Sequence, residues 1–90
     1  MTKEKPEITE NPVDIGNTGM ELILYNDDFN TFEYVIESLI EVCGHLPEQA
    51  EQCAIIAHTK GRCAVKTGNI DVLKRNHTDM IKRGLTTKIE

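Results

Sequence analysis

Residues 20–34 read MELILYNDDFNTFEY, and this stretch predicts a strand that runs directly into a helix. Its first half, up to Tyr25, is rich in apolar residues that strands accept. Asn30 is a good N-cap residue, and Glu33 follows three residues later, which gives a variant of the capping box. We therefore expect Asn30 to cap a helix whose apolar face continues to Cys43.

Between this strand and this helix lie three side chains with oxygen acceptors, Asn26, Asp27 and Asp28. One or two such residues are usual in a turn, where they make local hydrogen bonds. Three of them together also form a candidate binding site for a cation. A helix N-terminus favours anions, and the carboxylates already supply that charge. The residues alone leave two interpretations open, a solvated turn and a cation-binding turn.

Length and composition predict one small soluble domain. The chain has 90 residues, of which 39% are apolar and 28% are charged. Its net charge of −5 argues against nucleic acid as the main partner, because no basic patch is available to neutralise phosphates. The two Tyr and two Phe residues are also too few for a platform on which bases stack.

The sequence also bears on the cellular compartment. No apolar run approaches the length that crosses a membrane. The first residues, MTKEKPE, lack the apolar stretch of a secretory signal. Cys43, Cys53 and Cys63 are an odd number of cysteines in such a chain. We expect reduced thiols and a cytoplasmic protein.

The remaining elements follow from apolar periodicity and from the positions of Gly and Pro. Helices are expected at 31–43, 47–60 and 70–83, and further strands at 62–67 and 85–89. The fold class is therefore α+β, in the order β-α-α-β-α-β, with three helices packed on a three-stranded, mostly antiparallel sheet. Residues 1–19 show no such period and are predicted to form a flexible N-terminal tail, which leaves residues 20–90 as the folded domain.

The third helix is expected to begin after an N-cap at Asn69 and to point one stripe of residues into the core. That stripe comprises Ile70, Leu73, His77, Met80 and Ile81. We interpret His77 as a histidine at the edge of the core and not as a ligand.

Several of these features together resemble the ClpS adaptor family. They are YNDDF at 25–29, Glu33 and Val35 in the first helix, His58 and Gly61 at the end of the second, and CAVKT at 63–67. The resemblance covers about residues 20–89. It implies a non-enzymatic adaptor without a cofactor. Such adaptors bind substrates with a bulky apolar first residue and deliver them to a Clp AAA+ unfoldase and its peptidase for ATP-dependent degradation.

The resemblance also implies which residues form the site. A free α-amino group is largely charged near neutral pH and offers three hydrogen-bond donors. Its acceptors would be Asn26, Asp27, Asp28 and His58. The first side chain of the substrate would enter a pocket formed by Asn30, Phe32, Val35, Ala54, Ala57 and Leu85. Lys74 matches a family position for docking to the N-terminal domain of a ClpA-like or ClpC-like unfoldase. Phe32 and Ala54 stand where many family members have methionine.

Two other classes of function compete with this interpretation. One is an enzyme class, with a metal site that would draw on Cys43, His45, Cys53, His58 and Cys63, or with covalent catalysis by a Cys–His pair. Their spacings do not match zinc-binding pairs, and no third orienting group is identifiable. The ribosomal stalk C-terminal domain has a similar order of elements and would make this chain an interaction domain without amine recognition. That role favours a basic, Ala- and Gly-rich helical surface, which this chain lacks.

Overall fold

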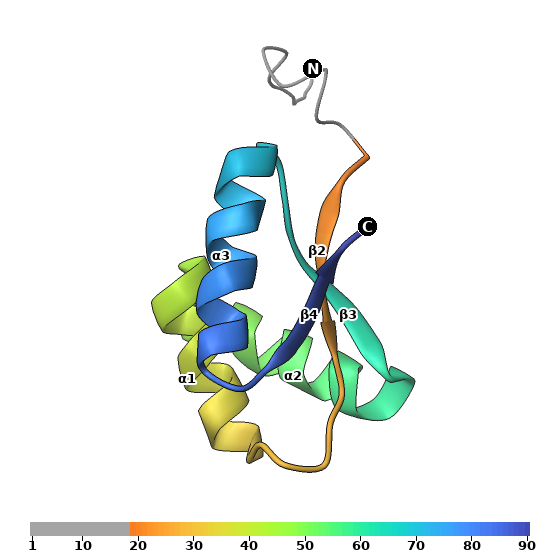
Figure 1. Ribbon diagram of the computed structural model, residues 1–90. Helices are drawn as coiled ribbons and strands as arrows, with labels where there is room; N and C mark the ends of the chain where they lie inside the picture. The colour runs from red at the N-terminus through yellow and green to blue at the C-terminus, as the bar shows by residue number, and fades with distance from the viewer. Residues whose placement is uncertain (1–18) are drawn as a thin grey trace.

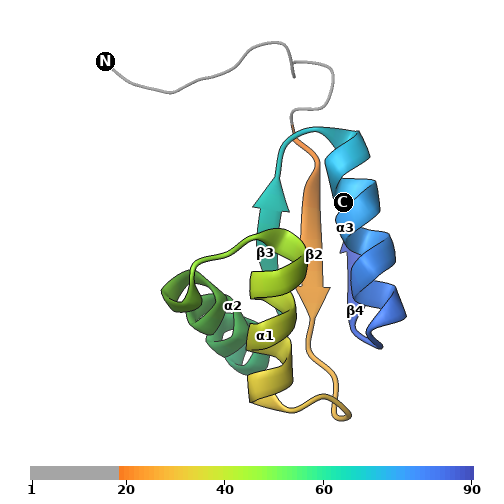
Figure 2. The same ribbon diagram turned by 90° about the vertical axis from the view of Figure 1, so that its left-hand side faces the viewer.

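The computed structural model describes residues 19–90, so the predicted tail at residues 1–19 lies outside the described residues except for Gly19. Three helices lie on one side of a three-stranded sheet (Figures 1 and 2). In chain order the elements are β2 (Glu21–Tyr25), α1 (Phe32–Cys43), α2 (Pro47–Lys60), β3 (Arg62–Thr67), α3 (Ile70–Lys82) and β4 (Thr86–Ile89). This confirms the predicted α+β fold and the predicted order of its elements.

The sheet has the strand order β3-β2-β4, and both pairings are antiparallel. β2 is therefore the central strand, and its Leu24 lies opposite Cys63 on one side and Thr87 on the other. Beyond the strand, the backbone N–H of Asn26 donates to the carbonyl of Gly61 over 3.0 Å. This bond holds the turn after β2 against the end of α2.

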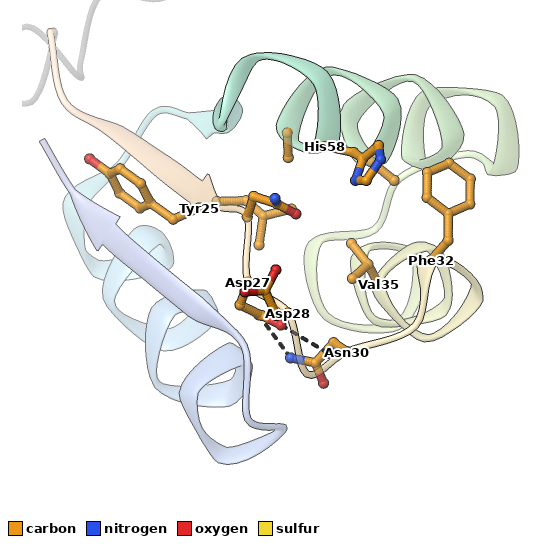
Figure 3. A pocket seen from close by; sticks show the side chains of 11 residues that line it. Tyr25, Asp27, Asp28, Asn30, Phe32, Val35 and His58 are labelled. Atoms are coloured by element: carbon orange, nitrogen blue, oxygen red, sulfur yellow. Dashed lines mark hydrogen bonds between the residues drawn. The ribbon is translucent and has the colours of Figure 1, made fainter.

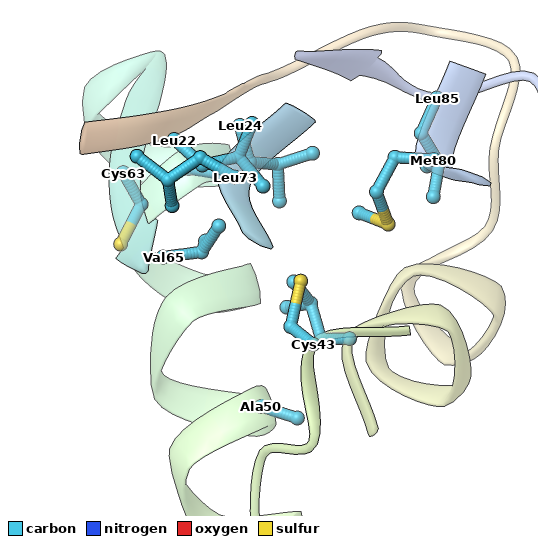
Figure 4. Close-up of a cluster of buried hydrophobic side chains, with 11 residues drawn as sticks. Leu22, Leu24, Cys43, Ala50, Cys63, Val65, Leu73, Met80 and Leu85 are labelled. Carbon is cyan, nitrogen blue, oxygen red and sulfur yellow. The ribbon is translucent and has the colours of Figure 1, made fainter. Parts of the chain in front are cut away.

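The core lies between the sheet and the helices (Figure 4). Leu22 and Leu24 of β2 contribute to it, and Leu39, Leu73 and Met80 from the helices are completely buried. The other buried members of this cluster are Cys43, Ala50, Ala57, Cys63, Val65 and Leu85. Because all three helices contribute to one cluster, the relative positions of α1 and α2 are set by packing and not by their loop alone.

The start of α1 differs from the prediction. Thr31, not Asn30, is the N-cap, and its Oγ1 accepts from the backbone N–H of Tyr34 over 3.0 Å. Asn30 is drawn away from the cap because its side-chain amide donates to the carboxylate of Asp27 over 2.9 Å. The predicted capping box with Glu33 is therefore wrong. The ends of the first two helices agree with the prediction, since Gly44 adopts a left-handed conformation after α1 and Gly61 after α2.

α3 begins after Asn69 as predicted, with the Asn69 side chain accepting from the backbone N–H of Asp71. The predicted inward stripe is wrong at Ile81, which is 48% exposed. Ile81 follows the buried Met80 directly and so lies about 100° further round the helix. Asn76 is buried instead, and its Nδ2 donates to the carbonyl of Val42 over 3.1 Å.

His77 lies at the edge of the core, in agreement with the sequence-based interpretation. It is half-buried, and its Nδ1 is 2.7 Å from Oγ1 of Thr87 on β4. This contact joins α3 to the edge of the sheet and explains the histidine without a ligand.

Candidate functional site

A cavity of about 480 Å³ opens where β2 ends, beside the first turn of α1 and the last turns of α2 (Figure 3). It is lined by Leu24, Tyr25, Asn26, Asp27, Asp28, Asn30, Phe32, Val35, Ala54, Ala57 and His58. Three segments that are distant in the sequence therefore meet at one site.

The cavity has a polar part and an apolar part. Oxygen-bearing side chains come from the turn at residues 26–30, and His58 comes from α2. Leu24, Val35, Ala54 and Ala57 supply the apolar wall. A ligand with a cationic head next to an apolar side chain matches this division.

The fold places His58 near the turn through the end of α2. His58 lies three residues before Gly61, whose carbonyl accepts from the backbone N–H of Asn26. His58 is exposed, and within residues 19–90 neither its ring nor the side chain of Asn26 or Asp28 makes a hydrogen bond. These side chains can therefore accept from a ligand.

Asp27 has a different place in the turn. Its Oδ1 accepts from the backbone N–H groups of Phe29 and Asn30 over 2.8 and 2.9 Å, and its Oδ2 accepts from Nδ2 of Asn30 over 2.9 Å. Partial burial raises the pKa of the Asp27 carboxyl, but these hydrogen bonds outweigh burial and leave the pKa below its ordinary value. Asp27 is thus kept ionised and holds the turn in shape.

The lowered pKa predicts how stability depends on pH. A carboxyl with a depressed pKa in the folded state stabilises the fold above its unfolded pKa of about 3.9, and this contribution is lost as the pH falls through the folded pKa. We expect urea unfolding to show that the wild type loses stability relative to Asp27→Asn below about pH 4. Parallel stability curves for the two proteins over pH 7 to 3 would contradict the role of Asp27 in the turn.

The structure brings together nearly all the residues that the sequence placed in the site. Leu85 is the exception: it is 3% exposed and belongs to the core, not to the wall of the cavity. Its backbone N–H donates to the carbonyl of Met80 over 3.0 Å, and this tight turn after α3 directs Leu85 inward. Leu24 and Tyr25 line the cavity but were not expected there. Their position at the end of β2, next to Asn26, is the signal that could have identified them.

Lys74 lies apart from this cavity. It is exposed on α3 and lines a shallow groove of about 260 Å³ together with Arg75, Thr78 and Asp79.

Among residues 19–90, no group of three or more His, Cys, Asp or Glu side chains is placed to hold a metal ion. The same part of the chain contains no helix that is long and apolar enough to cross a membrane.

Comparison with known proteins identifies the family. The family described as "ATP-dependent Clp protease adaptor protein ClpS" matches residues 17–88. This chain belongs to the ClpS family. The ATP-dependent Clp protease adapter protein ClpS of Synechococcus elongatus is 34% identical over 70 residues, which are 77% of this chain and 74% of the relative. The ClpS adapter of Nitratidesulfovibrio vulgaris is 37% identical over 51 residues, 54% of this chain and 51% of the relative, so this alignment spans about half of each protein.

A solved ClpS structure has the same fold. The structure of Agrobacterium tumefaciens ClpS2 bound to L-phenylalaninamide aligns with a TM-score of 0.68 at 22% identity, covering 79% of this chain and 93% of that one. Proteins of the ClpS family act as adaptors of a Clp protease and are not enzymes themselves. The family therefore favours an adaptor over the metal-site, Cys–His and ribosomal stalk interpretations.

Proposed function

We propose that this ClpS protein binds the first residue of its substrates, recognising a free α-amino group together with a bulky apolar side chain, and delivers them to a Clp unfoldase and peptidase for ATP-dependent degradation. One observation supports the proposal: a single cavity joins acceptors that make no hydrogen bond within residues 19–90 to an apolar wall. The ligand of the related ClpS2 structure, L-phenylalaninamide, combines an amine with an apolar side chain in the same way.

The amine would bind at the polar end of the cavity. An ammonium group donates up to three hydrogen bonds. Asn26 supplies an amide oxygen, Asp28 a carboxylate, and neutral His58 one ring nitrogen. The carboxylate of Asp27 already accepts three hydrogen bonds within the turn, so its contribution to the amine is mainly electrostatic. The net negative charge of the turn favours a cation over a neutral ligand.

The first side chain would enter the apolar end. Val35, Ala54 and Ala57 form its wall, and the small side chains on α2 leave volume for a large residue. Phe32 is 38% exposed at the rim and offers an aromatic surface to the same side chain. The cavity therefore selects for the amine at one end and for apolar bulk at the other.

A peptide series tests this selection directly. Fluorescently labelled peptides that differ only in their first residue would be titrated with the protein. We expect Phe- and Leu-first peptides to bind about ten- to hundredfold more tightly than Ser-first ones, because burial of a large apolar side chain contributes about 1.5–3 kcal/mol. Equal affinities would contradict the proposed selection for a bulky apolar first residue.

The partner is the N-terminal domain of a ClpA-like or ClpC-like unfoldase, and we propose that Lys74 contributes to docking. Lys74→Glu should weaken capture of that domain without changing peptide affinity, because Lys74 lies outside the cavity. Lys82→Glu makes the same charge change at another exposed position on α3 and is the control. Equal loss of capture in both variants would show a general charge effect.

We place the adaptor in the cytoplasm, where free thiols such as those of Cys43, Cys53 and Cys63 stay reduced.

A further inference from the structure

Asn30 connects two separate turns through one amide group. Its Nδ2 donates to Oδ2 of Asp27 over 2.9 Å and to the backbone carbonyl of Gly84 over 3.0 Å. Asp27 belongs to the turn after β2, whereas Gly84 lies between α3 and β4. Figure 3 shows the amide of Asn30 directed at the turn, below the cavity and opposite His58.

The backbone at Gly84 is fixed in place because its neighbour Arg83 makes three contacts with residues of α1. Oη of Tyr34 donates to the carbonyl of Arg83 over 2.8 Å. The guanidinium of Arg83 donates to Oγ of the buried Ser38 over 3.3 Å and forms an ion pair with Glu41. The amide of Asn30 therefore fastens the turn after β2 to a segment that is itself fixed on α1.

We propose that Asn30 is a positioning residue of the binding site, whose amide bridge between Asp27 and Gly84 holds the turn that presents Asn26 and Asp28 to the substrate amine. This inference rests on the proposed function. Both N–H groups of the amide are used in the bridge, so Asn30 acts through Asp27 and not by donating to the ligand.

The bridge also affects the ionisation of Asp27. The amide of Asn30 is one of the hydrogen bonds that lower the pKa of this carboxyl, so its removal should raise that pKa. The other titratable groups that line the cavity are Tyr25 at the end of β2, Asp28 on the same turn as Asp27 and His58 on α2. Arg83, next to Gly84, is paired with Glu41, and it is not among the causes of the pKa shift of Asp27.

Asn30→Ala and Thr31→Ala form a matched pair of test variants. Thr31→Ala removes the N-cap of α1 at the neighbouring position but leaves the amide bridge of Asn30 intact. We would follow the side-chain carboxyl carbon of Asp27 by NMR from pH 7 to 2 without peptide, and measure the affinity for a Phe-first peptide at several pH values. Variant-to-wild-type affinity ratios at each pH cancel any pH effect that the two proteins share.

We expect Asn30→Ala to raise the pKa of Asp27 and to weaken peptide binding about three- to tenfold near pH 7, the usual cost of one hydrogen bond. The loss should grow as the pH approaches the raised pKa. Thr31→Ala should lower stability and leave both readouts unchanged. An unchanged Asp27 titration in Asn30→Ala, or the same changes in Thr31→Ala, would overturn the inference. If the wild type binds no peptide, the proposed function fails, while the Asp27 titration still decides whether the bridge exists.

Discussion

Acetylation of the N-terminus is expected to abolish the binding of a Phe-first peptide. The acetyl group removes the positive charge and leaves Asn26, Asp28 and His58 facing a neutral amide. Each hydrogen bond to a charged group contributes about 1.5–3 kcal/mol, so losing even one lowers affinity about ten- to 150-fold. Acetylation also removes the ammonium charge that the negative charge of the turn attracts. The total loss of affinity should therefore exceed the loss of a single hydrogen bond.

The measurement is a fluorescence titration of the same peptide in its free and acetylated forms. His58→Ala and Asp28→Ala should reduce the ratio between the two affinities, because each removes an acceptor at the polar end of the cavity. Ala64→Ser on the exposed part of β3 should leave that ratio unchanged. Equal affinity of the two peptide forms for the wild type would end the amine-recognition proposal.

Replacement of Ala54 by Met is expected to change which side chains the cavity accepts. Ala54 is 3% exposed, lines the cavity from α2 and lies one helical turn before His58. A longer side chain there takes up cavity volume, and a single methylene in such a pocket is worth about 1–3 kcal/mol. Affinity for Trp-first peptides should therefore fall about tenfold or more relative to Leu-first peptides.

The informative quantity is the Trp-to-Leu affinity ratio, since overall destabilisation of the variant affects both peptides equally. Ala64→Met introduces the same side chain on the exposed surface of β3 and should leave the ratio unchanged. Thermal unfolding of both variants would be recorded in parallel, because added bulk at a buried position costs about 1–3 kcal/mol. A constant ratio in Ala54→Met would mean that Ala54 is part of the core and not of the binding wall.

The order and bounds of the elements could be predicted because the local signals are strong. Gly44 and Gly61 end their helices in the left-handed conformation, and Asn69 begins α3 as its residue type indicates. The N-cap of α1 could not be settled in the same way. Asn30 and Thr31 are both suitable caps, and only the contact of Asn30 with Asp27 and Gly84 decides between them.

The site could be predicted only in part, for the same reason. The roles of the turn and His58 were implied by the resemblance to the ClpS family, and the fold does bring them to one cavity. Leu24 was missed because three successive residues of β2, Leu22, Ile23 and Leu24, are buried, which hides the alternation that distinguishes the two sides of a strand. The resemblance implied Leu85 for the pocket, but Leu85 packs in the core, because the turn after α3, with its hydrogen bond to Met80, directs it inward.

The central position of β2 has a mechanical consequence. The chain enters β2 at Glu21, which pairs with Glu90 at the far end of the sheet from the cavity. A pull applied at Gly19 along the axis of β2 would load its hydrogen bonds to β3 and β4 in shear, so that both ladders would have to yield together. A motor that pulls this adaptor by its N-terminal end would therefore meet resistance at the first strand, the same strand whose other end lines the cavity.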